Sequence, residues 1–164
     1  MIRDVRRTIL SNLTVDKDII DTMLLRLRDE DTNTRKSIYR HVLPRYITDT
    51  TATASGPGFF HPHTLQIAQK ERIILDGLGD RDSGVVQEAT KLIGDWVDEL
   101  SGPKAEDGQS TSSAGVIELL KSLDLREEKA ASMALKAVFS SKPEVFGGIV
   151  FPGACILDSP FLYA

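Results

Sequence analysis

Three histidines and a single cysteine are the residues of this chain best suited to metal binding or nucleophilic chemistry. His61-Pro62-His63, with His41 elsewhere, is the one combination that could hold a metal ion. Structural zinc sites need four ligands, usually with cysteines at short spacings, and the sequence lacks that pattern. Cys155 has neither a base within reach in the sequence nor a nucleophile motif around it. We therefore expect turn histidines, no metal and no cofactor.

Paired carboxylates and nearby glycines are the other candidates for catalysis or phosphate binding. Asp29/Asp31 and Asp80/Asp82 lie in acidic turns between apolar segments. Aspartates at such positions cap the following helix by accepting backbone N–H bonds. The stretch Gly77-Leu78-Gly79 stands where a predicted helix ends, which is a common place for glycine, and it does not match a phosphate-binding loop. We expect this protein not to be an enzyme.

Basic residues in the first quarter of the chain are spaced to form a strip along one side of the predicted helices. The candidates for contacts with DNA phosphates are Arg6, Arg7, Lys36 and Arg40, with Arg45 nearby. Phosphate backbones are bound by several fixed cations at matching spacing. No aromatic residues interleave with the strip and no recognition-helix pattern accompanies it, so base readout is not expected. The alternative is an ordinary solvated helix face.

Arg35 is set apart from that strip because it lies near the apolar side of its helix. It follows Asp29 by six residues. In stacked helical hairpins, an aspartate in the turn and an arginine early in the second helix commonly pair with the neighbouring repeat, and buried charges are usually paired. Asp29 and Arg35 are therefore predicted to be structural ladder residues, which means that their ion pairs link one repeat to the next. Val86 stands where the next ladder arginine would be, so the ladder is incomplete.

The elements that carry these residues show an internal repeat with an offset of 51 positions. Each copy is an apolar helix end, then an acidic turn, then a second amphipathic helix. Self-similarity of this kind indicates helical-hairpin repeats, in which no unit buries its apolar face alone. The offset superposes Leu24 on Leu75, Leu27 on Leu78, Asp29 on Asp80, Asp31 on Asp82, Ile38 on Ala89 and Val42 on Ile93.

Apolar residues at helical spacing recur up to residue 146 and predict an all-α solenoid of three to four antiparallel helix pairs, an α-α superhelix. No strand is expected before residue 147, and Trp96 is expected to fill the core between hairpins. Segments rich in Gly, Pro, Ser and Thr predict loops near 48–63 and 101–113. Residues 147–164 have no helical period and are expected to form an irregular apolar tail. The sequence leaves open whether this tail packs back, pairs with a partner, stays disordered or is a gene-model artefact.

Charge and hydropathy narrow the class of protein. The net charge is −4, but residues 1–47 carry ten Lys/Arg against seven Asp/Glu. An acidic chain is a poor indiscriminate binder of nucleic acid, whereas a basic first quarter allows a local contact. One cysteine cannot form an internal disulfide, and no apolar run is long enough to cross a bilayer. We expect a nuclear or cytosolic protein.

Several sequence blocks, taken in order, resemble one known family, the HEAT-repeat subunit of condensin called chromosome-associated protein G, or condensin subunit 3 in fungi. The resemblance runs from about residue 3 to residue 146. Its blocks are Val5-Arg6-Arg7, Leu27 to Tyr39, Leu65 to Arg72, Gly77 to Asp82, Leu92 to Val97, and Ala134 to Phe146.

This resemblance implies HEAT-type helix pairs without catalysis of their own. It further implies a complex with coiled-coil ATPase subunits and a kleisin chain, and a role in mitotic chromosome condensation. In that family the solenoid grips a kleisin segment and double-stranded DNA in a basic groove, without a small-molecule substrate or a membrane. We expect this chain to be a fragment that begins within a repeat. The competing interpretation is a HEAT scaffold that binds only protein partners.

Overall fold

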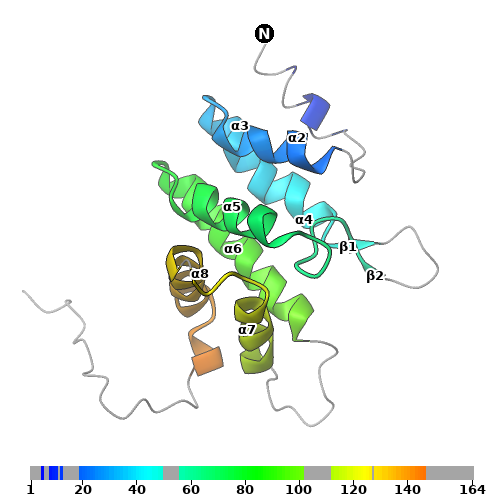
Figure 1. Cartoon of the computed structure of the whole chain (residues 1–164). Coiled ribbons are helices and arrows are strands. Elements are labelled where there is room, and N and C mark those ends of the chain that lie inside the picture. Colours follow the sequence, from blue (N-terminus) through cyan, green and yellow to red (C-terminus); the bar gives the residue numbers. More distant parts are fainter. Residues whose placement is uncertain are drawn as a thin grey trace, which may run out of the picture.

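The computed structural model shows a chain built mainly of helices (Figure 1). It describes residues 5, 8–10, 12, 19–49, 56–101, 112–126 and 128–146. From Ile19 onward the helices are α2 (Ile20–Leu25), η1 (Arg26–Arg28), α3 (Thr32–Ser37), η2 (Ile38–Val42), α4 (Leu43–Arg45), α5 (Ile67–Leu78), α6 (Ser83–Leu100), α7 (Ser112–Lys121), α8 (Glu128–Ser141) and η3 (Pro143–Phe146). None of the described helices has the length and apolar character needed to cross a bilayer. The tail at 147–164 lies outside the described residues.

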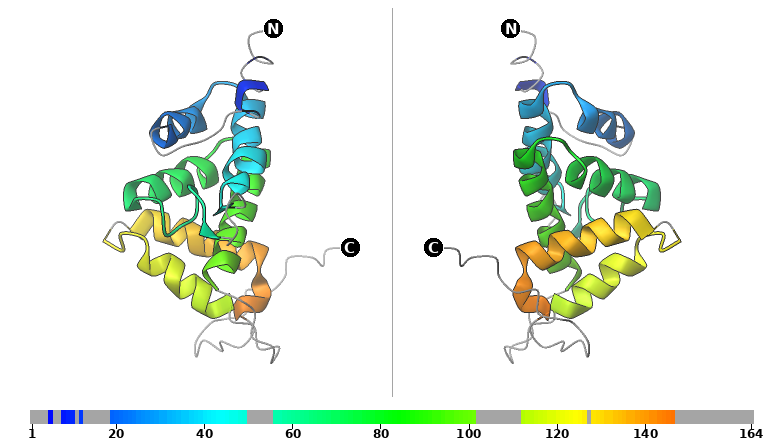
Figure 2. Two further views of the ribbon diagram at one scale, coloured as in Figure 1. Left: turned by 90° about the vertical axis from the view of Figure 1, so that its right-hand side faces the viewer. Right: turned by 90° about the vertical axis from the view of Figure 1, so that its left-hand side faces the viewer.

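The helices from α2 to α8 follow one another as three successive pairs (Figures 1 and 2). In the first two pairs, like helices stack: α5 contacts α2 and η1, while α6 contacts α3, η2 and α4. The third pair departs from this order, because α7 packs on α6 and α8 packs on both α5 and α6. The expectation of helical pairs is therefore confirmed, but the stacking changes at the third pair.

The second helix of the first pair contains a widened turn. Residues Ile38–Val42 form a π-helix, in which the N–H of Leu43 reaches back five residues to the carbonyl of Ile38. Pro44 follows directly, has no N–H to donate, and so interrupts the regular α-helical ladder. The helix from α3 to α4 is thus continuous but locally unwound near its middle.

The expectation of no strand before residue 147 was wrong at one point. Strands β1 (Thr48–Asp49) and β2 (Gly56–Pro57) pair antiparallel, with Thr48 opposite Pro57 and Asp49 opposite Gly56. The loop is closed further by hydrogen bonds from Gly58 N–H to the Ile47 carbonyl (2.7 Å) and from Phe60 N–H to the Tyr46 carbonyl (2.9 Å). Two-residue strands are too short to leave an alternating pattern in the sequence.

One continuous apolar core runs through all three pairs. Trp96 is fully buried in it, as the sequence predicted. Tyr39 is also buried, and its hydroxyl donates to the Ile73 carbonyl at 2.9 Å. Gly77 lies inside α5 and packs against the ring of Tyr39. A Cβ at this position would lie 2.7 Å from both Tyr39 Cζ and the Cβ of Ala89. Close packing of helices, and not helix termination, therefore requires a glycine at this position.

Candidate functional site

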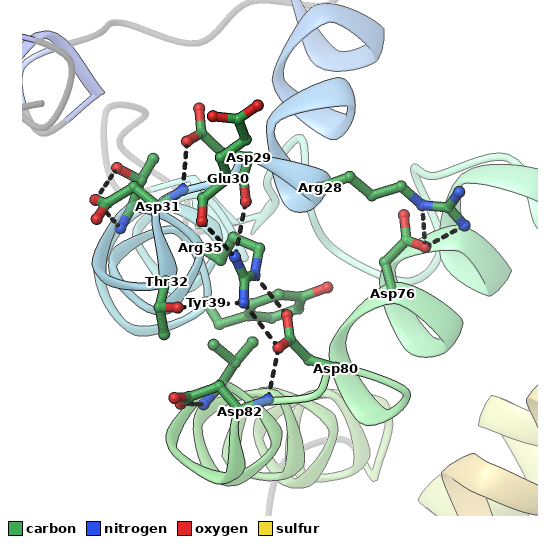
Figure 3. A network of polar contacts seen from close by, with 12 residues as sticks. Arg28, Asp29, Glu30, Asp31, Thr32, Arg35, Tyr39, Asp76, Asp80 and Asp82 are labelled. Carbon is green, nitrogen blue, oxygen red and sulfur yellow. Dashed lines mark hydrogen bonds and ion pairs between the residues drawn. The ribbon is translucent and has the colours of Figure 1, made fainter. Parts of the chain in front are cut away.

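Acidic turns join the helices of each pair, and the first two have the same geometry (Figure 3). Asp29 and Asp80 each accept the N–H of the residue two positions later, at 2.9 and 2.8 Å. Asp31 then caps α3 by accepting the Thr34 N–H (3.0 Å), and Asp82 caps α6 by accepting the Gly84 N–H (2.9 Å). The capping expected of these aspartates is confirmed, and it fixes where each second helix begins.

Arg35 connects these two turns. Its Nε and Nη2 donate to the two carboxylate oxygens of Asp80 at 2.6 and 3.0 Å. Its Nη1 donates to the backbone carbonyls of Asp29 (2.7 Å) and Glu30 (3.3 Å). The Arg35 and Asp80 side chains are only 5% and 6% exposed, so the pair is both buried and bidentate.

The electrostatics of this pair follow from its geometry. The hydrogen bond to Asp80 raises the pKa of Arg35 against the opposing effect of burial. Burial alone would raise the pKa of the Asp80 carboxyl, but hydrogen bonds from Arg35 and from the Asp82 backbone outweigh it. The pKa of Asp80 consequently lies below its ordinary value. Both groups are therefore charged at neutral pH.

The carboxylate that faces Arg35 was not singled out from the sequence. Arg35 donates to the backbone carbonyl of Asp29 in its own turn, and it forms its ion pair with the carboxylate of Asp80 in the following turn. The signal that identifies this partner is the 51-residue offset, because Asp80 is the repeat equivalent of Asp29. An arginine placed to reach the neighbouring repeat should meet the equivalent aspartate there.

A second inter-pair contact, also not predicted, joins Arg28 of η1 to Asp76 of α5 (Figure 3). Nε and Nη2 of Arg28 both lie 2.8 Å from Oδ1 of Asp76. Oδ2 of Asp76 is 3.5 Å from Nε of Arg72 and is buried without a hydrogen bond. The Asp76 side chain is 5% exposed and that of Arg28 is 76% exposed, so the ion pair lies at the edge of the structure.

The predicted basic strip is described only in part. Arg6 and Arg7 lie outside the described residues. Arg40 is exposed on η2, while Lys36 on α3 is half-buried. A Cβ at Gly84 would lie 2.9 Å from Nζ of Lys36, so this ammonium group sits over the start of α6 instead of projecting into solvent. Lys36 therefore touches the second pair, which its helical position alone did not indicate.

Two of the three histidine candidates, His61 and His63, lie in the loop before α5, whereas His41 is exposed on η2 and apart from them in the sequence. His61 is buried, and its Nδ1 accepts the N–H of His63 at 3.1 Å. Burial and the neighbouring His63 lower the pKa of His61, which favours the neutral ring. In the part of the chain that the structure describes, no group of three or more His, Cys, Asp or Glu residues could hold a metal ion. Cys155 lies outside that part.

The structure thus defines a class of protein made of packed helical pairs, in which a buried arginine, Arg35, joins the acidic turns of the first two pairs. Against curated proteins, the chain is 28% identical over 151 residues to condensin complex subunit 3 of Schizosaccharomyces pombe. It is 28% identical over 153 residues to condensin complex subunit 3 of Saccharomyces cerevisiae. Each match covers 91% of this chain, and the chain spans 14% and 12% of the length of these two relatives.

These comparisons confirm the resemblance to condensin subunit 3 and extend it over nearly the whole chain. The chain is similar to a small part of each of those proteins. No protein-family model matches it, and no solved structure matches it.

Proposed function

We propose that this chain serves as part of a condensin subunit of the chromosome-associated protein G type, in a HEAT-type solenoid without catalytic activity. Its setting is the nucleus and the mitotic chromosome, and its partners are a kleisin subunit and the coiled-coil ATPase subunits of condensin. The observation that carries this proposal is the similarity to two condensin complex subunit 3 proteins over 91% of the chain.

In this proposal the chain contacts double-stranded DNA through the phosphate backbone. Lys36 and Arg40 lie one turn apart on the second helix of the first pair, with Arg40 exposed and Lys36 over the start of α6. The N-terminal end of a helix favours negative charge, so a phosphate near Lys36 would meet both the ammonium and the helix dipole. Together with Arg6 and Arg7, these cations would bind DNA without base preference.

The salt dependence of DNA binding tests this role. We use a double variant, Lys36→Gln with Arg40→Gln, because glutamine removes each charge without adding a carboxylate beside Asp82. Each lost phosphate contact should shallow the slope of log K against log salt by about 0.9, equally for all duplex sequences. Fluorescence anisotropy with labelled duplexes measures this slope, and Lys136→Gln on α8 is the matched control.

A protein-only scaffold is the second candidate, and the net charge of −4 favours it. Its partners would be bound through apolar and polar contacts whose strength changes little with salt. If the folded double variant keeps the DNA affinity and slope of the unmodified chain, the DNA role of this strip is rejected and the scaffold is favoured. Far-UV circular dichroism establishes that the variant is folded.

A further inference from the structure

A cleft opens between the first and second pairs, at the edge where the turns meet the start of α8. Its volume is about 680 Å³. Its walls come from the end of η1, the last turn of α5, the turn after it and the first turns of α8. Of the residues labelled in Figure 3, those that line the cleft are Arg28, Asp29, Glu30, Arg35, Asp76 and Asp80. Lys36 and Arg40 do not line it, so the cleft is separate from the basic strip.

The buried and the exposed charges of this cleft differ. The side chains of Asp76 and Asp80 are 5% and 6% exposed, and both are paired with arginines. Three cations are on the rim: Arg28 is 76% exposed at its side chain, and Arg81 and Lys129 are exposed as well. Among the lining residues, Glu30 is the one exposed carboxylate. Among the described residues, neither Arg81 nor Lys129 makes an ion pair. The exposed rim therefore carries three cations against one carboxylate, and a ligand entering the cleft meets net positive charge.

The cleft also has an apolar surface. Leu27, Leu75 and Met133 contribute side chains to its lining. A polypeptide can supply apolar side chains together with its carboxylates, whereas a phosphate backbone supplies no apolar groups.

We propose that this cleft binds an acidic segment of a partner polypeptide. Carboxylates of the segment pair with Arg81 and Lys129 on the rim. Arg28 forms an ion pair either with Asp76 or with a carboxylate of the segment. An apolar side chain of the segment packs against Leu75 and Met133. Charge complementarity at the exposed rim selects an acidic partner. This site goes beyond the proposed DNA role and does not depend on it.

The test uses the full chain and a short fluorescein-labelled peptide of glutamates and aspartates around a central leucine. The double variant Arg81→Glu with Lys129→Glu should weaken binding of this peptide by about tenfold or more, since two attractive contacts become repulsive. Lys136→Glu, on the same helix as Lys129 but outside the cleft, should leave binding unchanged. Both altered side chains are exposed, and a thermal melt checks that the variant is folded.

Two comparisons separate this site from the DNA strip. The Lys36→Gln, Arg40→Gln variant should bind the acidic peptide as the unmodified chain does, whatever its effect on DNA. A peptide with lysines in place of the acidic residues should not bind. Equal binding of the two peptides, unchanged binding by the folded Arg81 and Lys129 variant, or loss of duplex DNA binding alone in that variant would each overturn the proposal. The last outcome would assign the cleft to nucleic acid.

Discussion

Replacement of Arg35 by methionine is expected to destabilise the fold strongly. Methionine keeps much of the apolar stem but removes the guanidinium group, which leaves the buried Asp80 carboxylate and the Asp29 carbonyl without this donor. Removing one partner of a buried ion pair costs about 3 to 5 kcal/mol. We expect the lower end, about 3 kcal/mol, because the pair borders the open cleft between the first two helical pairs.

Urea unfolding followed by far-UV circular dichroism measures this loss. Asp80→Asn is the second arm of a double-mutant cycle, since asparagine can still accept the Asp82 N–H through its amide oxygen while losing the charge. The double variant should be less destabilised than the sum of the two single variants, with a coupling of about 1 to 3 kcal/mol. Lys121→Met, which breaks the exposed pair with Glu118, is the control and should cost less than about 1 kcal/mol.

Two results would refute this reasoning. One is a loss below about 1 kcal/mol for Arg35→Met, because the pair would then behave as an exposed one. The other is strict additivity of the two single variants, because the side chains would then stabilise the fold independently.

Acid should destabilise the fold through Asp80. The pKa of Asp80 in the folded protein lies below the unfolded value of about 4. The contribution of Asp80 to the free energy of unfolding is therefore fully present above that unfolded value and is lost as pH falls through the folded pKa. Unfolding free energy measured against pH should fall less steeply in Asp80→Asn, and an unchanged slope would contradict this assignment. Gly77→Ala should destabilise by about 1 kcal/mol or more, since its new methyl would lie 2.7 Å from Tyr39 Cζ and overpacking outweighs the better helix propensity of alanine. In Gly94→Ala the new methyl would lie 3.3 Å from the flexible end of Lys142 and 3.5 Å from Ser141 Oγ, so this variant should be neutral or stabilising by up to about 1 kcal/mol. Equal melting temperatures of the two variants would argue against the packing account.

Local structure was predictable from the sequence because it depends on neighbouring residues. The apolar stripe of Ile20, Leu24 and Leu27 is buried, and Asp31 and Asp82 cap the helices that follow them. These features follow from helical spacing and from the preference of aspartate for the first turn. The internal offset likewise places equivalent turns next to each other in the stack.

Features that depend on distant partners were not predictable in the same way. The contact between Arg28 and Asp76 joins residues 48 positions apart and has no counterpart in the repeat pattern. The direction of the Lys36 side chain was missed because a helical wheel assigns it to one face, while its long stem lets the ammonium reach the start of α6. The π-helix before Pro44 shifts the following residues further around the helix axis, which periodic spacing alone does not reveal.

The change of stacking at the third pair coincides with the absence of a ladder arginine from the second pair. Val86 occupies the repeat position of Arg35 and has no donor to hold the next turn. It instead lines an apolar groove of about 260 Å³ with Met133 and Ala137 of α8. The third turn is held from the other side of the pair, where Glu71 of α5 accepts the Asp124 N–H at 2.9 Å. The third pair therefore has its polar contact on α5 and its apolar contact on α6, and so it lies across both helices of the second pair. In the first pair, by contrast, the first helix packs on the first helix of the second pair, and the second helix packs on the second.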